Sequence, residues 1–159
     1  MLKLYHGSTV EISEIDLSKS RPNKDFGKGF YLSANRQQAL RMAEFKALTE
    51  GGNPTINTYL FDDELLKSNK LKTLIFNGYT EEWAEFIFAN RNNPTKQQVH
   101  DYDIVYGPIA NDRVGVQISK YETGIISLEQ FIENLKYMGG VTYQYFFGTE
   151  KAISKLQKV

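Results

Sequence analysis

The stretches YHGS (residues 5–8) and DFGKGFYLS (residues 25–33) decide the fold that we expect for this sequence. The first ends a short strand-like run at a glycine. The second opens with two glycines and becomes strand-like at residues 30–32. Because glycine has no Cβ, the backbone of Gly7 can approach a flat ligand closely. One extended glycine also presents a donor and an acceptor side by side, which is the pair that a primary carboxamide needs.

The Gly-Lys pair of the second stretch invites comparison with a phosphate-binding loop. The pattern GxxxxGK[ST] is absent, because residues 26–29 lack both the upstream glycine and the following Ser or Thr. The dinucleotide pattern GxGxxG is absent too, since Gly27 and Gly29 lead into a strand rather than a helix. What remains is a tight glycine turn that delivers Tyr31, either to stack on a planar ring or to pack in the core.

Strands and helices mix without strict βαβ alternation along the rest of the chain, which predicts an α+β fold. Strands are expected at residues 3–6, 30–32, 55–61, 71–76, 103–110, 113–119 and 141–147. Helices are expected at residues 36–49, 62–68, 80–91, 127–138 and 149–156. The first helix has Asn35 as its N-cap, and Ala39, Met42, Ala43 and Leu48 fall at helical spacing on it. No linker or repeat divides the 159 residues, so we expect one domain over residues 1–159.

The composition narrows the classes of function. Nineteen basic and 19 acidic residues leave no net charge, which disfavours a nucleic-acid or anionic membrane partner. The absence of cysteine excludes a disulfide-linked partner, a thiolate nucleophile and a zinc–cysteine site. The N-terminal residues are too short and polar for a signal peptide, and no apolar run approaches membrane-spanning length. The default expectation is a soluble, cytoplasmic protein without a membrane partner.

The two stretches together resemble the opening of the ADP-ribosyltransferase catalytic domain of the diphtheria-toxin and poly-ADP-ribose-polymerase branch. Further blocks, namely the QAL of the next helix, DYDIVYGPIAND and QYFFGTEKAISKL, make nearly the whole chain similar to an uncharacterised bacterial family of ADP-ribosyltransferase-like proteins. The resemblance implies two packed, antiparallel-rich sheets that form an NAD cleft with flanking helices. It also implies NAD as a co-substrate.

The resemblance assigns roles to three residues of the opening stretches. His6 would hydrogen-bond the adenosine-side ribose hydroxyl, the Gly7 backbone would clamp the nicotinamide carboxamide, and Tyr31 would stack on the nicotinamide ring. Taken alone, a histidine at a strand end is more often a structural hydrogen-bonding group than a ligand contact.

Three further residues follow from the same resemblance as ligand-positioning groups. Ser8 or Ser33 would help to orient the dinucleotide. Met42 stands where the family often has a second aromatic ring, so it would form an apolar wall that cannot stack in the same way.

The catalytic carboxylate of the family has no direct counterpart. Transferases of this branch open a late strand with a glutamate, and the matching residue here is Gln144. An amide can hydrogen-bond a ribose hydroxyl but supplies no charge, a loss of about 3–4 kcal/mol of transition-state stabilisation. Glu150, at a helix start, and Asp103 or Asp112 are the carboxylates that we consider as replacements. Alternatively, Glu150 complements the dipole at the start of its helix, and the two aspartates cap loops and turns.

No metal site is expected. His100, Asp101 and Asp103 follow one another too closely in an extended segment to face one ion together. The lysines at 67, 70 and 72 and at 151, 155 and 158 are interpreted as solvated edges, and the helix around Trp83 as core.

Three functions remain open. The first is a mono-ADP-ribosyltransferase, as a bacterial toxin or effector that modifies an intracellular protein or nucleic-acid acceptor and is paired with an antitoxin. The second is an NAD glycohydrolase, with water as the acceptor. The third is a catalytically inert module that binds NAD or ADP-ribose and regulates another process.

Overall fold

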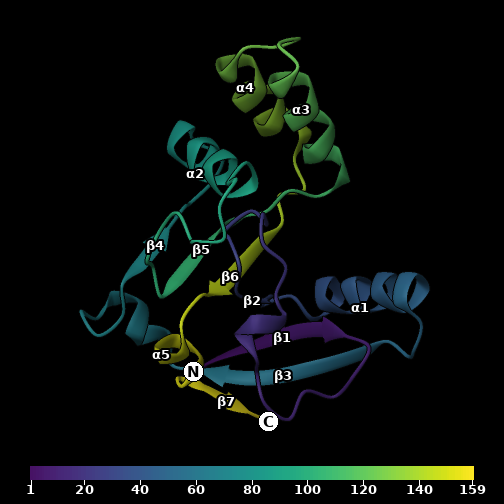
Figure 1. The fold of residues 1–159 in the computed structure, drawn as a ribbon, viewed down its shortest axis with the longest axis vertical. Helices are drawn as coiled ribbons and strands as arrows, with labels where there is room; N and C mark the ends of the chain where they lie inside the picture. The colour runs from purple at the N-terminus through teal and green to yellow at the C-terminus, as the bar shows by residue number, and fades with distance from the viewer.

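The computed structural model describes the whole chain apart from the side chain of residue 112, and it contains two β-sheets and five α-helices (Figure 1). Sheet 1 has the order β1-β3-β7 and is antiparallel throughout. Sheet 2 has the order β2-β6-β5-β4, in which only the β4–β5 pair is parallel. The strands are β1 (Leu2–Ser8), β2 (Phe30–Leu32), β3 (Thr55–Phe61), β4 (Thr73–Ile75), β5 (Ile104–Pro108), β6 (Tyr143–Phe147) and β7 (Leu156–Lys158).

The helices begin where the sequence places polar caps. They are α1 (Arg36–Glu50), α2 (Glu81–Arg91), α3 (Asp112–Glu122), α4 (Leu128–Met138) and α5 (Glu150–Ile153), with 3-10 turns η1 (Leu17–Lys19) and η2 (Asp63–Lys67). The side chains of Asn35, Thr80, Ser127 and Thr149 each accept a hydrogen bond from an amide of the first turn that follows. The expected α+β class is confirmed, as are the starts of these four helices.

A single bridge joins the two sheets. Tyr5 and Ser33 exchange both of their backbone hydrogen bonds at 2.8 Å, which holds β1 against the end of β2. Between the sheets lies one apolar core, which includes Leu4, Phe61 and Phe147. Because side chains alternate along a strand, Leu4 and His6 face this core while Gly7 faces α1 on the other side.

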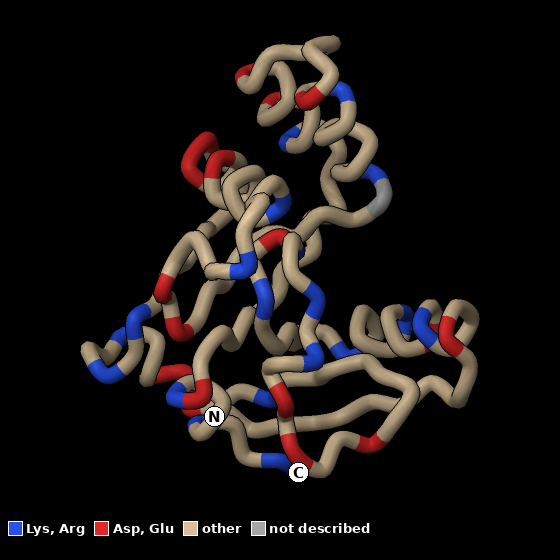
Figure 2. The backbone as a smooth tube through the Cα atoms, in the orientation of Figure 1, with Lys and Arg blue, Asp and Glu red and all other residues tan. Residues whose placement is uncertain are grey.

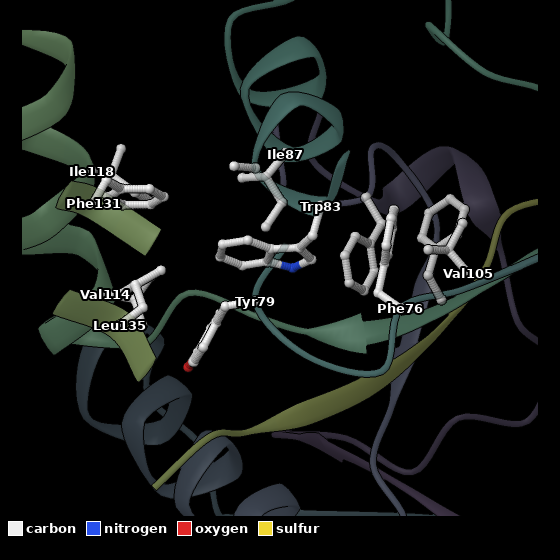
Figure 3. Close-up of a cluster of buried hydrophobic side chains, with 12 residues drawn as sticks. Phe76, Tyr79, Trp83, Ile87, Val105, Val114, Ile118, Phe131 and Leu135 are labelled. Atoms are coloured by element: carbon white, nitrogen blue, oxygen red, sulfur yellow. The ribbon is translucent and has the colours of Figure 1, made fainter. Parts of the chain in front are cut away.

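A second core covers the opposite face of sheet 2. Trp83 of α2 is fully buried there, and Figure 3 shows its ring between the residues of α3 and α4 and those nearer the sheet. Its indole nitrogen donates to the carbonyl of Pro108 at 2.7 Å. The α3–α4 hairpin is inserted between the neighbouring strands β5 and β6 and packs against the body of the protein through this aromatic cluster (Figure 1).

Two predictions of secondary structure are wrong, for residues 113–119 and for the end of the last helix. Residues 113–119 belong to helix α3 rather than a strand, because Val114 and Ile118 are buried one turn apart while Val116 is 55% exposed. The last helix stops at Ile153, because the free edge of β3 accepts residues 156–158 as an added strand.

The buried face of α1 also differs from the expectation. Ala39 and Ala43 are buried, whereas Met42 is 42% and Leu48 is 88% exposed. The cause is the close approach of β1, since a Cβ on Gly7 would lie 2.1 Å from the carbonyl oxygen of Ala39. Only small residues fit the face of the helix that crosses the strand this closely.

Candidate functional site

His6 is held as a neutral ring with one free acceptor. Its ring stacks on Phe30 with centroids 4.2 Å apart, and its Nδ1 lies 2.7 Å from the carbonyl oxygen of Tyr31. A carbonyl oxygen only accepts, so Nδ1 carries the hydrogen and Nε2 keeps its lone pair. Burial, and then the charge of Lys46, lowers the pKa of His6 to about 4, against the opposing effect of the hydrogen bond to Tyr31. His6 is therefore suited to accept a hydrogen bond from a hydroxyl group.

Gly7 turns its peptide groups away from the strand ladder. Because Tyr5 directs its N–H and C=O to Ser33, the alternation of an antiparallel pair directs those of Gly7 to the same edge, opposite Tyr31 in the register of that bridge. The carbonyl accepts the Lys46 ammonium at 2.9 Å. The amide makes no hydrogen bond outside the β1–β3 ladder within the described residues, although Gly7 is buried. The amide at this edge is therefore available to an acceptor from outside the sheet.

Tyr31 has its hydroxyl group committed to the glycine loop, which we define as residues 23–29. The hydroxyl donates to the carbonyl of Gly27 at 2.7 Å and accepts from the amide of Phe26 at 3.0 Å. The ring meets Phe146 edge to face, and the Lys24 ammonium lies 5.1 Å from its centroid. Tyr31 therefore fixes the loop through its oxygen, while its ring packs on Phe26 and against the second core and carries the Lys24 ammonium.

Residues outside the glycine loop hold it in place through an ion pair and hydrogen bonds, and the sequence did not predict this role for them. Asp25 forms a 2.9 Å ion pair with Arg91 and accepts from the amide of Ala110 at 2.6 Å. Gln98 bonds both the amide and the carbonyl of Lys28, and His100 donates to the carbonyl of Phe26 at 2.7 Å. His100 is thus a support for the loop. Within the part of the chain that the structure describes, no cluster of potential metal ligands is present.

Gln144 lies on the same face of sheet 2 as Tyr31. Tyr31 and Phe146 are direct partners across the β2–β6 pair, and Gln144 is two residues from Phe146 along β6. Same-face diagonal neighbours of this kind are about 7–8 Å apart at their Cα atoms, within reach of long side chains. The structure therefore brings Gln144 together with Tyr31, next to the strand edge that carries His6 and Gly7.

The other predicted ligand contacts are placed less directly. The Ser33 hydroxyl is buried and engaged with the amide of Asn35 at 2.9 Å and with Gln38 at 3.1 Å. Ser8 accepts a long 3.4 Å contact from the amide of Val10. Met42 stands one helical turn from Lys46, so it lines the same stripe of α1 that reaches Gly7. Ser33 is thus a local cap, whereas Ser8 and Met42 border the site.

Asp103 and Glu150 lie at the other end of β6. The Asp103 carboxylate accepts from the amide of Lys72 at 2.8 Å and from the hydroxyl of Thr149 at 2.6 Å, and the Asp103 carbonyl accepts from Gly148. Glu150 is the exposed first residue of α5. At a strand rise of about 3.3 Å per residue, Gly148 and Gln144 are about 13 Å apart, so the structure places these carboxylates at the opposite end of β6 from Gln144. The side chain of Asp112 lies outside the described residues.

Positive charge gathers around this strand edge although both signs are dispersed over the molecule as a whole (Figure 2). Lys24 reaches the Tyr31 ring and Lys46 reaches the Gly7 carbonyl. Sequence reasoning missed both residues. One signal was present, because Lys46 continues the i, i+4, i+7 spacing of Ala39 and Ala43, where an apolar residue is expected.

One concave part of the surface lies beside this edge, and a larger one lies between α2 and α4, lined by Glu81, Leu128 and Ile132 among others. A cavity of about 190 Å³ opens by Ser33 and Asn35 and is lined by the rings of Tyr106, Tyr143 and Tyr145. Gln144 alternates with Tyr143 and Tyr145 along β6, so it points to the opposite face of the sheet. The site of His6, Gly7 and Tyr31 is thus distinct from this cavity.

Fold and site together define an α+β protein with a histidine, a glycine and a tyrosine at a shared strand edge. The chain belongs to the family described as a protein of unknown function (DUF3990), whose model matches residues 2–158. No curated protein and no solved structure matches the chain. Among the described residues, no helix has the length and apolar character needed to cross a membrane.

Proposed function

We propose that this chain is an NAD-dependent mono-ADP-ribosyltransferase with the ADP-ribosyltransferase fold, in which His6, Gly7 and Tyr31 bind the dinucleotide. The observation that carries the proposal is the Gly7 edge. Within the described residues, the amide of the buried residue Gly7 has no hydrogen bond outside the ladder, and it lies beside a carbonyl whose only recorded side-chain contact is a lysine. This is the donor–acceptor pair that a nicotinamide carboxamide complements.

The neutral His6 supports the same assignment. Its Nε2 lone pair can accept only from a donor such as a ribose hydroxyl, and a protonated ring would be unable to do so. The Tyr31 ring then offers an apolar surface to the nicotinamide, while its hydroxyl is already occupied by the loop.

The chemistry that we propose is displacement at the nicotinamide-side ribose. The bond from C1′ to the nicotinamide nitrogen breaks, nicotinamide leaves with the electron pair, and an acceptor atom bonds to C1′ as it releases its proton. The ribose becomes cationic on the way, and Gln144 can accept a hydrogen bond from the 2′-hydroxyl without neutralising that charge. Because Gln144 has no carboxylate, we expect turnover to be about 100- to 1,000-fold slower than with a glutamate at this position.

Gln144 specifically favours a second candidate, a module that binds NAD and does not cleave it. Water as the acceptor would give the glycohydrolase reaction through the same first step. These outcomes differ only in what becomes of the dinucleotide after it binds, so binding and turnover have to be measured separately.

Calorimetric titration with NAD tests the binding site. We expect His6→Ala and Tyr31→Ala to weaken binding by at least tenfold, and Tyr31→Phe to weaken it less, because the ring is preserved and only the hydroxyl contacts with the glycine loop are lost. Tyr137→Ala is the matched control, since Tyr137 is 88% exposed on α4. Equal heats for the wild type and both alanine variants at the site would rule out the proposed site.

Radiolabelled NAD incubated with the protein and a cell lysate tests the reaction. Label on a macromolecule indicates transfer, free ADP-ribose indicates hydrolysis, and intact NAD indicates binding alone. Gln144→Glu restores the missing charge, so we expect it to raise cleavage by about 100- to 1,000-fold. Gln157→Glu on exposed β7 controls for added charge. No gain from Gln144→Glu would remove Gln144 from the proposed mechanism.

A further inference from the structure

Two lysines occupy the surfaces that the proposed function assigns to nicotinamide. The Lys24 ammonium, from the glycine loop, lies 5.1 Å from the centroid of the Tyr31 ring. The Lys46 ammonium, from α1, binds the Gly7 carbonyl at 2.9 Å. Both contacts are weak partners for an ammonium group compared with an anion, because an aromatic face and a carbonyl carry only partial negative charge.

Neither lysine has a carboxylate partner within the described residues. The nearest candidates are already engaged, since Asp25 pairs with Arg91 at 2.9 Å and Glu50 pairs with Arg21 at 3.4 Å. Lys72 and Lys158, by contrast, each form an ion pair. The site therefore holds two ammonium groups in excess of its carboxylates.

The two ammonium groups lie within electrostatic reach of each other. Burial, and then the charge of Lys46, lowers the pKa of Lys24, and both lysines lower the pKa of His6. Burial also lowers the pKa of Lys46, against the opposing effect of the Glu50 charge. A multiply charged anion placed between them would relieve this repulsion and give each ammonium a full counter-charge.

We propose, on the basis of the proposed function, that Lys24 and Lys46 form the subsite for the diphosphate of the bound dinucleotide. In the free protein the same ammonium groups rest on Tyr31 and Gly7. When the dinucleotide binds, they move to the phosphate oxygens and expose the Tyr31 ring and the Gly7 carbonyl to nicotinamide. The diphosphate is then required for the nicotinamide end to bind well.

If the lysines exchange partners in this way, they should favour binding of the diphosphate and oppose binding of nicotinamide alone. Removing both side chains takes away the counter-charges of the diphosphate, and it also clears the two surfaces on which nicotinamide lies. The variant should therefore bind phosphate-containing ligands less tightly and free nicotinamide more tightly. A lysine that only stabilised the fold would not reverse its effect in this way.

The experiment is calorimetric titration of the full chain with inorganic pyrophosphate, NAD and nicotinamide. The variants are Lys24→Ala, Lys46→Ala and the double substitution, with Lys19→Ala as the control on an exposed residue of η1. Thermal melting of each variant establishes that it is folded. We expect each single substitution to weaken pyrophosphate and NAD about tenfold, and the double variant to bind nicotinamide more tightly than the wild type.

The outcomes separate this inference from the proposed function. If pyrophosphate fails to bind the wild type, or binds the double variant equally well, the subsite is overturned. If NAD binds the wild type and the double variant equally, the subsite is overturned while the proposed function stands. If NAD does not bind but pyrophosphate binds through the lysines, the anion subsite is supported and the proposed function is overturned.

Discussion

His6 shows how the surroundings of one side chain set its chemistry. Its Nδ1 hydrogen is used by the Tyr31 carbonyl, its ring is covered by Phe30, and the nearby Lys46 opposes any further positive charge. Folding therefore favours the uncharged ring, whereas the unfolded chain leaves His6 free to take up a proton. The difference appears as a dependence of stability on pH.

Replacing His6 with Asn, which keeps a hydrogen-bond donor but cannot titrate, should reveal this dependence. The pKa of His6 falls from 6.5 to about 4 on folding, so its contribution is complete above pH 6.5 and is lost as the pH falls toward 4. Relative to His6→Asn, the wild type should lose at most about 1.4 kcal/mol of unfolding free energy per pH unit in that window. Urea titrations at pH 7, 6, 5 and 4 measure it. A constant difference between the two proteins would contradict the neutral assignment.

Part of the candidate site could be proposed from single residues. His6, Gly7 and Tyr31 could be singled out from the sequence because each lies in a recognisable local pattern. His6 and Gly7 lie at the end of a strand, and Tyr31 follows a glycine turn. Lys24 and Lys46 could not be singled out, because their meeting depends on how closely α1 crosses β1. That crossing is set by the missing Cβ of Gly7.

At the level of secondary structure, α1 and β1 pack with almost no space between their backbones. We expect Gly7→Ala to destabilise the protein by about 2–4 kcal/mol, because its Cβ would lie 2.1 Å from a backbone oxygen and the whole helix must shift. Gly115→Ala is the matched change, on helix α3 with no atom within 4 Å of the added Cβ. It should stabilise by about 0.5–1 kcal/mol through helix propensity. Chemical denaturation of both variants tests the pair, and an equal loss in both would contradict this packing.

Asp103 connects three segments through its carboxylate and its carbonyl, at the opposite end of β6 from Gln144. Asp103→Ala leaves the Lys72 amide and the Thr149 hydroxyl without their acceptor, so we expect a loss of about 2–4 kcal/mol in stability. Asp101→Ala removes only an exposed ion pair and should change stability by less than about 1 kcal/mol. Denaturant midpoints distinguish the two. NAD affinity should remain at the wild-type value in folded Asp103→Ala, and a selective loss of turnover would restore its catalytic assignment.

Helix starts were predictable and some element types were not. Four helix starts could be recognised because an N-cap residue hydrogen-bonds amides only two or three positions away. These N-cap residues are Asn35, Thr80, Ser127 and Thr149. Residues 113–119 satisfy strand alternation and helical spacing equally well, and only the neighbouring aromatic cluster decides between them. Strand β7 depends on the free edge of β3, which no local pattern reveals.

On the scale of the whole molecule, Trp83 joins the α3–α4 hairpin to the rest of the protein. It is the only tryptophan in the sequence, and it is fully buried between the hairpin and sheet 2 (Figure 3). Its indole hydrogen bond to Pro108 ties the same ring to the end of β5. Tryptophan fluorescence therefore reports on the docking of the hairpin.

If residues 1–159 form one domain, as predicted, the hairpin and the sheets should unfold together. Urea titrations followed by Trp83 fluorescence and by far-ultraviolet circular dichroism should then give coincident midpoints. Trp83→Phe cannot serve in the fluorescence arm, but it should lower the circular dichroism midpoint because it leaves the Pro108 carbonyl without a donor. A fluorescence transition at lower urea than the circular dichroism transition would mean that the hairpin detaches first.

The bridge between Tyr5 and Ser33 also determines how individual peptide hydrogens exchange with deuterated solvent. The amides of Tyr5 and Ser33 are hydrogen-bonded across the bridge, so they should retain their protons until the sheets part. The amide of Gly7, two residues further along β1, lacks an acceptor outside the ladder among the described residues and should lose its proton sooner. A ligand carbonyl bound at this edge would slow the exchange of that one proton. Its protection would locate the ligand on β1 before any turnover is detected.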